Sequence, residues 1–310
     1  MPSFLSLNTA LRPLCFNPAL DTEPSGIDAY LGFYQLEALT AQHRIGTINS
    51  SEYRLAVQYW LPENAQHTTL IAHGYFDHVG LYRHVIRFLL ENNYAVIAFD
   101  LPGHGLSSGA RAVIHDFDEY GQAIHAILSA STAGKLPPVT LGFGQSTGCA
   151  AWMNFHMVGF QNTIEKMILF SPLLRPDHWI TLGNPSYLAL RHFVQFIPRK
   201  FKNNSSDKKF LQFCHHEDPL QPRFLTVAWV GAMKNWLERF PKQTAIKIPT
   251  LILQGQNDTT VDWRYNIPAI QKKMPLTQVH YLAEANHHLA NESQTIRARI
   301  EQIVTAFLGA

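Results

Sequence analysis

The stretch VTLGFGQSTGCAAWMNFHMV, residues 139–158, changes character at its serine. Before Ser146 the run is apolar and rich in β-formers, as in a buried strand. After it, small residues open a stretch that is typical of a helix. Gly144 and Gly148 flank the serine in the pattern G-x-S-x-G. The pattern predicts a sharp strand-to-helix turn that exposes the serine hydroxyl. The positive end of the helix dipole would lie next to this hydroxyl.

Two other interpretations of these glycines are a phosphate-binding loop and an ordinary turn. The stretch lacks the spacing G-x-x-x-x-G-K-[ST] and its lysine, and its glycines miss G-x-G-x-x-G by one position. G-x-S-x-G alone is a weak signal. A nucleophilic serine also needs a base, and the base needs an orienting acid, so the rest of the chain has to supply both.

Short apolar runs recur along the chain, each ended by turn residues. They span residues 68–74, 94–100, 139–144, 166–171, 250–255 and 278–284. Stretches with helical spacing, such as 81–93 and 118–130, lie between them. Runs of this length predict strands that are buried on both faces. Their alternation with helices predicts an α/β fold with a mostly parallel sheet and helices on both sides.

The pattern divides the chain into three parts. Residues 1–42 are interpreted as an N-terminal arm with one helix over about 28–40. Residues 43–174 and 248–310 form the core, which begins with a hairpin that turns near residues 50–51. Alternation breaks in the aromatic-rich segment 175–247, where 222–240 has helical spacing. We therefore expect a mainly helical insertion between two strands of one sheet.

Composition excludes several classes of protein. The 310 residues carry a net charge of only +2, without a basic run, so we expect no nucleic-acid partner. Three widely spaced cysteines argue against a disulfide framework or a zinc site, and we expect no metal or cofactor. No secretory signal and no membrane span of about 18 apolar residues is recognised. The expectation is a soluble cytoplasmic protein, whose oligomeric state the sequence does not indicate.

A candidate acid and base follow the last two predicted strands. GQNDTTVD, residues 255–262, comes after one strand, and EANHHLANE, residues 284–292, comes after the next. The carboxyl ends of parallel strands meet at one edge of a sheet, so these loops are expected beside the serine. The chain order serine, aspartate, histidine is that of α/β-hydrolases. Spacing alone leaves two aspartates and two histidines as candidates.

The chain resembles the α/β-hydrolase superfamily, in particular the monoacylglycerol lipase and lysophospholipase-like branch, which overlaps the serine aminopeptidase-type group. Five motifs in the expected order carry the resemblance. They are HGYFDHVGLYRHV (73–85), FDLPGHGLSSG (99–109), GQSTG (144–148), LILQGQND (251–258) and HHLANE (287–292). The resemblance covers the core from about residue 43 onward, and it implies that 175–247 is a cap, or lid, over the site.

The resemblance also implies roles for individual residues. Ser146 is the expected nucleophile. His287 matches the histidine of H-x-x-x-x-E and is the expected base, and Asp258 matches the aspartate of G-x-x-D. The backbone N–H groups of Thr147 and Tyr75 are the expected oxyanion donors.

The remaining candidates receive structural interpretations. We expect His288 to begin a helix and face solvent or the cap, and Asp262 to cap a helix. Gln145 and Cys149 stand where the family often has histidine and glycine. We expect Gln145 to adjust packing or hydrogen bonds under the turn, and Cys149 to be a buried small residue. A loop-bracing role is expected for the motif residues Asp100, His104 and Ser107.

These observations predict a serine hydrolase of carboxylic esters that acts on a small-molecule ester, in particular a monoacyl lipid such as a lysophospholipid or monoacylglycerol. We expect some aromatic residues of the cap to line an acyl pocket, whereas others only pack the cap helices onto the core. Transient contact with a membrane surface is compatible with such a substrate. The cap contains no arginine cluster for a phosphate. Alternatives are an acyltransferase and a peptidase in which Glu217 and Asp218 anchor the peptide terminus. Two further alternatives remain open. One is a non-catalytic binding protein. The other is a metal hydrolase whose ligands are His215 and His216 or His287 and His288.

Overall fold

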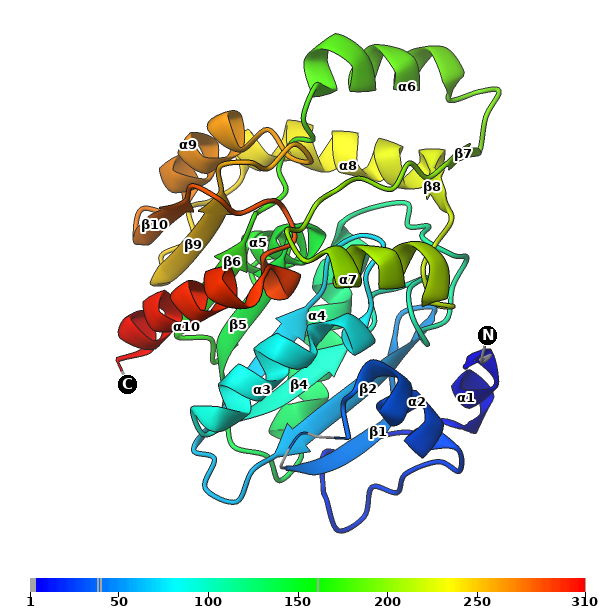
Figure 1. The fold of residues 1–310 in the computed structure, drawn as a ribbon, viewed down its shortest axis with the longest axis vertical. Coiled ribbons are helices and arrows are strands. Elements are labelled where there is room, and N and C mark those ends of the chain that lie inside the picture. Colours follow the sequence, from blue (N-terminus) through cyan, green and yellow to red (C-terminus); the bar gives the residue numbers. More distant parts are fainter. Residues whose placement is uncertain (1–3, 38, 40, 161, 310) are drawn as a thin grey trace.

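The computed structural model describes residues 4–37, 39, 41–160 and 162–309, and eight of its strands form one sheet (Figure 1). The strand order is β1-β2-β4-β3-β5-β6-β9-β10. The bounds are β1 Gln42–Ser50, β2 Tyr53–Leu61, β3 His67–Ala72, β4 Tyr94–Phe99, β5 Val139–Gln145, β6 Lys166–Phe170, β9 Thr250–Gly255 and β10 Thr277–Leu282. β2 is antiparallel to both β1 and β4, and all other neighbours are parallel. Each predicted strand is present, and the predicted hairpin turns between Ser50 and Tyr53.

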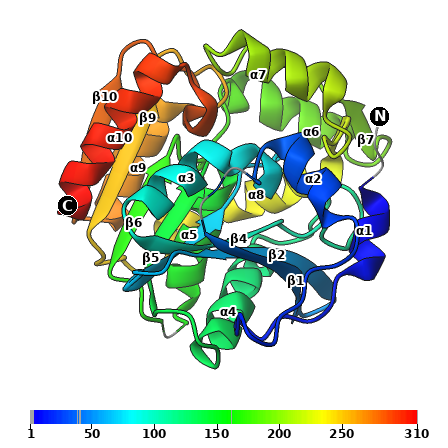
Figure 2. The ribbon, with the colours of Figure 1, turned by 60° about the horizontal axis from the view of Figure 1, so that its bottom comes forward.

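Helices cover both faces of the sheet, which confirms the predicted α/β fold class (Figure 2). α3 (Arg83–Glu91) and α10 (Gln294–Leu308) pack on one face, and α4 (Asp118–Thr132), α5 (Thr147–Val158) and α9 (Trp263–Lys273) pack on the other. The central strands are buried along almost their whole length, because each face contacts a helical layer. No helix among the described residues is long and apolar enough to cross a membrane.

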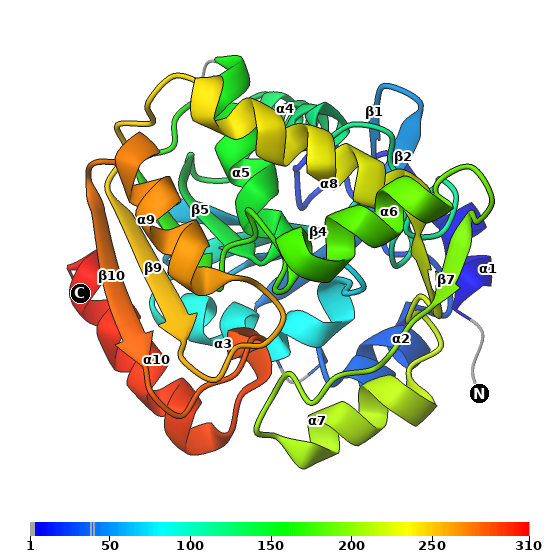
Figure 3. The ribbon, with the colours of Figure 1, turned by 90° about the horizontal axis from the view of Figure 1, so that it is seen from above.

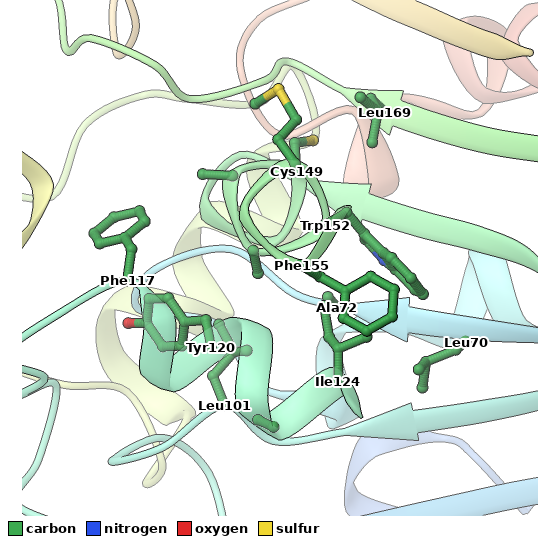
Figure 4. Close-up of a cluster of buried hydrophobic side chains, with 14 of the residues drawn as sticks. Leu70, Ala72, Leu101, Phe117, Tyr120, Ile124, Cys149, Trp152, Phe155 and Leu169 are labelled. Atoms are coloured by element: carbon green, nitrogen blue, oxygen red, sulfur yellow. The ribbon is translucent and has the colours of Figure 1, made fainter. Parts of the chain in front are cut away.

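α5 lies at the centre of one apolar layer (Figure 4). Trp152 and Phe155 of α5 are fully buried among side chains of β3 and α4, including Leu70 and Ile124. Burying a large apolar side chain contributes roughly 1.5–3 kcal/mol. This packing therefore fixes the helix that begins directly after Ser146.

The N-terminal segment contains two short helices, α1 (Leu5–Ala10) and α2 (Ile27–Tyr34). The helix expected over 28–40 is too long. It ends at Tyr34, because Gln35 adopts a left-handed conformation with φ 56° and returns its N–H to the last helical carbonyls. Residues 38 and 40 of that expectation lie outside the described residues. Tyr30 and Tyr34 are buried in the same apolar cluster as α3.

A long segment between β6 and β9 lies above the carboxyl ends of the strands (Figure 3). Its elements are η2 Trp179–Gly183, α6 Asn184–Leu190, β7 Phe196–Pro198, α7 Lys208–Gln212, η3 Phe213–Glu217, β8 Phe224–Thr226, α8 Val227–Arg239 and η4 Phe240–Lys242. β7 and β8 pair antiparallel. The helix expected over 222–240 is wrong at its start, because 224–226 forms β8 and the Thr226 hydroxyl caps α8.

Candidate active site

Three side chains from the loops after β5, β9 and β10 meet at the carboxyl edge of the sheet. Ser146 follows β5, Asp258 follows β9 and His287 follows β10. The His287 Nε2 atom lies 2.9 Å from Ser146 Oγ, and its Nδ1 atom lies 2.8 Å from Asp258 Oδ2. The structure thus brings together the serine, histidine and aspartate that were selected by resemblance, and all three are largely buried.

The turn at Ser146 depends on the two flanking glycines. Ser146 has φ 54° and ψ −111°, an unfavourable conformation for a residue with a side chain. A Cβ atom on Gly148 would lie 1.9 Å from the Ala72 carbonyl oxygen, and one on Gly144 would lie 2.7 Å from the Cys149 nitrogen. Only glycine permits this close approach of α5 to the strands. The Ser146 backbone is held by an N–H bond to the Phe170 carbonyl at 2.9 Å.

Asp258 is held by four hydrogen bonds. Its Oδ1 accepts from the backbone N–H groups of Thr260 and Val261, at 2.7 and 3.2 Å. Its Oδ2 accepts from His287 and from the Gln254 side-chain amide. Burial by itself would raise the pKa of Asp258, but its contact with His287 and the other hydrogen bonds hold it below its ordinary value. The carboxylate is therefore ionised at neutral pH and accepts the Nδ1 proton, which leaves Nε2 facing the serine as an acceptor.

Two residues fix the loop that carries His287. Gln145 donates its side-chain amide to the His287 carbonyl at 2.9 Å, which agrees with the hydrogen-bonding role expected for it. Glu292 is fully buried and accepts from the N–H groups of Asn286, at 2.5 Å, and Ser206, at 2.7 Å. Ser206 belongs to the segment between β6 and β9. The glutamate of the H-x-x-x-x-E motif therefore joins the histidine loop to that segment.

A buried carboxylate that sequence reasoning missed holds the loop after β3. Asp77 Oδ2 accepts from Gly74 N–H at 3.2 Å and from Tyr82 OH at 2.9 Å, and it lies 3.2 Å from His288 Nε2. Burial alone would raise the pKa of Asp77, but the neighbouring His288 and these hydrogen bonds lower it strongly. His288 does begin a short helix, η5 Leu289–Asn291, but the alternative that it faces solvent is wrong, because this pair buries it.

The two candidate oxyanion amides are those of Tyr75, which follows β3, and Thr147, which directly follows Ser146. Tyr75 and Thr147 both line the cavity that Ser146 opens into. Within the described chain, neither backbone N–H donates to another protein group. Thr147 is the first residue of α5, where a helix leaves its amides without internal partners. The Tyr75 ring is fixed by stacking on Trp229, with centroids 3.9 Å apart.

The other sequence candidates have structural environments. Asp262 caps α9 by accepting from Tyr265 N–H at 3.2 Å, as expected. Asp100 accepts from Val79 and Leu106 N–H groups, both at 2.7 Å, and braces the loop as predicted. Cys149 is buried, as expected, and burial raises the pKa of its thiol. Across residues 4–37, 39, 41–160 and 162–309, no three His, Cys, Asp or Glu side chains are grouped as metal ligands.

A cavity of about 400 Å³ extends from Ser146 beneath the segment between β6 and β9. Its walls are mostly apolar. Residues of η2, α6 and α8 contribute, among them Trp179, Leu182, Leu190, Trp229, Val230 and Met233. Trp179, Tyr187 and Trp229 of the aromatic-rich segment therefore line the cavity, whereas Trp236 and Phe240 are packed in the core. The lining also includes Arg199, which the sequence did not single out.

The acidic pair considered as a peptide anchor does not line this cavity. Asp218 is fully buried and accepts from His78 Nε2 at 2.8 Å and from Tyr34 OH at 2.7 Å. Glu217 lies at a separate depression beside α2 and α3. Their positions do not favour the alternative in which they anchor a peptide terminus, because neither lines the cavity and Asp218 is engaged in a buried network.

Comparisons with known proteins agree with this architecture. Residues 63–294, more than half of the chain, match the protein family described as serine aminopeptidase, S33. The chain is 23% identical over 209 residues to phospholipase YtpA of Bacillus subtilis, covering 66% of this chain and 80% of that protein. It is 31% identical over 228 residues to monoglyceride lipase of Mus musculus, covering 69% and 73%.

Among solved structures, the fold is similar to a soluble variant of monoglyceride lipase from Saccharomyces cerevisiae. The TM-score is 0.73 at 19% identity, over 87% of this chain and 96% of that chain. At this identity the likeness concerns the fold alone, which is a mostly parallel sheet with helices on both faces.

Proposed function

The chain belongs to the serine aminopeptidase S33 family of α/β-hydrolases, in the branch with monoglyceride lipases, and on this basis we propose that it hydrolyses carboxylic esters through Ser146, His287 and Asp258. The observation that carries the proposal is the unbroken hydrogen-bond chain from Ser146 Oγ through His287 to Asp258. Serine, base and orienting acid in this arrangement are the parts that acyl transfer requires.

The reaction follows from this geometry. Ser146 Oγ attacks the ester carbonyl while His287 Nε2 takes its proton, and Asp258 stabilises the imidazolium. The N–H groups of Tyr75 and Thr147 bind the oxyanion of the tetrahedral intermediate. The intermediate collapses to an acyl-enzyme, and the leaving alcohol takes the proton from His287. Water, deprotonated by His287, then attacks the acyl-enzyme, which releases the acid and restores the serine.

A monoacyl lipid is the substrate class that the cavity supports best. The apolar walls suit an acyl chain, because each buried CH₂ group contributes about 0.8 kcal/mol. A peptide substrate would need an anchor for its charged terminus, and the acidic pair considered for it lies elsewhere. We therefore favour esters over peptides, and lysophospholipids or monoacylglycerols over small esters. In this proposal 175–247 serves as the cap over residues 43–174 and 248–310.

Contact with a lipid surface is part of the proposal, because such substrates reside in membranes or micelles. Large apolar side chains near α6 are exposed, namely Ile180, Leu182, Leu188, Leu190 and Phe193, the last at 85%. α6 stands at the outermost end of the molecule (Figure 1). Two of these residues, Leu182 and Leu190, also line the cavity.

The test is hydrolysis of nitrophenyl esters from acetate to palmitate, with Ser146→Ala as the blank. We expect a serine-dependent rate that peaks at medium or long chains. Asp258→Asn should lower kcat by about 10⁴-fold. A peak at acetate would indicate a small-ester enzyme. Wild-type turnover by Ser146→Ala would overturn the proposed mechanism.

A further inference from the structure

The cavity beside Ser146 contains one strongly basic side chain. Arg199 follows β7, and among the described residues that line the cavity it is the only arginine or lysine. Other polar residues of the lining include Asn204, His288 and the carboxylate Asp77, whereas η2, α6 and α8 supply the apolar walls. The cavity therefore combines an apolar region for a chain with a cationic group.

Arg199 is held in place by protein contacts. Its Nη1 donates to Gln221 Oε1 at 2.5 Å, and its guanidinium lies against the rings of Phe76 and Phe201, at 4.1 and 4.3 Å. Gln221 is buried and donates in turn to Asp218 at 3.0 Å. These contacts fix the direction of the side chain before any ligand binds, which lowers the entropic cost of using it in recognition.

The charge of Arg199 has no direct partner. Within the described chain it forms no salt bridge, and its Nε and Nη2 groups donate to no protein atom. The nearby acids are engaged elsewhere, Asp77 with His288 and Asp218 with His78, and Arg223 adds a second positive charge. Burial lowers the pKa of Arg199 to about 10, so the group stays charged at neutral pH.

We propose that Arg199 binds the phosphate of a lysophospholipid head group and makes the enzyme prefer phosphate-bearing monoacyl lipids to monoacylglycerols. The inference rests on the ester hydrolase activity proposed above. A guanidinium with free N–H groups offers two parallel hydrogen bonds to a phosphate, whereas a glycerol head group carries no charge to pair with it. The cap lacks an arginine cluster, but a single arginine whose direction is fixed is sufficient to bind one phosphate.

The test compares two lipids with the same acyl chain, a lysophosphatidylglycerol and a monoacylglycerol, in the same mixed micelles. We expect wild type to have the higher kcat/KM for the lysophospholipid. Arg199→Met should reduce the ratio of the two kcat/KM values by about tenfold to hundredfold, mainly through KM, because charge-assisted hydrogen bonds are lost. Arg199→Lys should keep part of the preference, since it keeps the charge.

Arg223→Met is the matched control, because Arg223 contacts Phe201 but does not line the cavity. Because Arg223 contributes only a more distant charge, its substitution should change the ratio far less than Arg199→Met does. If Arg199→Met lowers both kcat/KM values by the same factor, or if wild type prefers monoacylglycerol, the inference is wrong while the esterase activity stands. If Ser146-dependent hydrolysis of either lipid is absent, the proposed function itself fails.

Discussion

The side-chain amide of Gln145 donates a hydrogen bond of 2.9 Å to the backbone carbonyl of His287. Gln145 is the last residue of β5 and directly precedes Ser146. The strand that carries the candidate nucleophile is thus joined to the loop that carries the candidate base. Both groups are buried, so loss of the bond leaves an unsatisfied carbonyl beside the site.

Replacing Gln145 should therefore disturb catalysis more than substrate binding. For Gln145→Ala we expect kcat to fall by about tenfold to hundredfold, because small displacements of a catalytic group have effects of this size. Gln145→His introduces the histidine that is common at this position in the family and keeps a hydrogen-bond donor. Its kcat should therefore fall less than that of Gln145→Ala. Gln122→Ala, at an exposed position of α4, is the control. Ester kinetics measure the effect, and an unchanged kcat in Gln145→Ala would contradict the positioning role.

A second prediction concerns the glycine after the serine. Gly148→Ala places a Cβ atom 1.9 Å from the Ala72 carbonyl oxygen, which is backbone and cannot rotate away. We expect the free energy of unfolding to fall by about 3 kcal/mol, as in overpacked cores. Gly32→Ala is the matched control, because its Cβ meets nothing within 4 Å in α2.

Gly32→Ala should be slightly more stable than wild type, by about 0.5–1 kcal/mol, because alanine has a higher helix propensity than glycine. Chemical denaturation measures both variants. Equal unfolding midpoints for Gly148→Ala and wild type would argue against the close approach of α5 to β3.

A third prediction follows from the buried pair of His78 and Asp218. Burial alone would lower the pKa of His78, but the adjacent Asp218 charge raises it above 6.5. Burial alone would raise the pKa of Asp218, but His78 and Tyr34 lower it below 3.8. The contribution of His78 to stability is complete below about pH 6.5 and is lost as pH rises through its raised pKa. The contribution of Asp218 is complete above about pH 4 and is lost as pH falls through its lowered pKa.

Asp218→Asn should therefore destabilise the protein most between about pH 4 and 6.5, by about 3–5 kcal/mol, and less at alkaline pH. Urea unfolding across this pH range measures the difference from wild type. Glu238→Gln is the control, because its exposed pair with Lys234 should contribute only about 0.3–0.5 kcal/mol. A difference that does not decline above the pKa of His78 would show that the pair is not ionised in the folded protein.

Local patterns were sufficient to predict the sheet and the meeting of the loops that carry Ser146, Asp258 and His287, whereas the family resemblance selected Asp258 over Asp262 and His287 over His288. Each strand was a short apolar run, and each of these residues lies just beyond the end of a strand. Strand ends lie at one edge of a parallel sheet, so position along the chain was enough to place them together. The end of α2 and the start of α8 were mispredicted, because one depends on a left-handed Gln35 and the other on pairing between β7 and β8.

The contacts around the site were not predictable in the same way. Asp77 and His288 pair across a long sequence separation, and Arg199 reaches the cavity only because β7 and Gln221 direct it there. No motif marks Arg199, since a single arginine has no spacing to recognise. Tertiary packing, which a single sequence does not display, decides both features.

The exposed apolar surface near α6 leads to the last prediction. Leu188 and Phe193 are 47% and 85% exposed, and burying such side chains in a lipid surface is favourable by roughly 25 cal/mol per Å² of apolar area. Replacing both by serine should reduce binding to lipid vesicles in co-sedimentation by about tenfold or more, because up to 3 kcal/mol is lost for each large side chain. Hydrolysis of a water-soluble nitrophenyl ester should change far less, since neither residue lines the cavity.

The control is Leu276→Ser, at a site 51% exposed between α9 and β10. It removes an exposed leucine, similar in exposure to Leu188, from a different part of the molecule, so vesicle binding should stay at the wild-type level. Equal losses in the control and the α6 variant would mean that apolar surface anywhere on the protein binds lipid. Full binding by the α6 variant would mean that this surface does not approach the membrane, and the substrate would then have to reach Ser146 from solution.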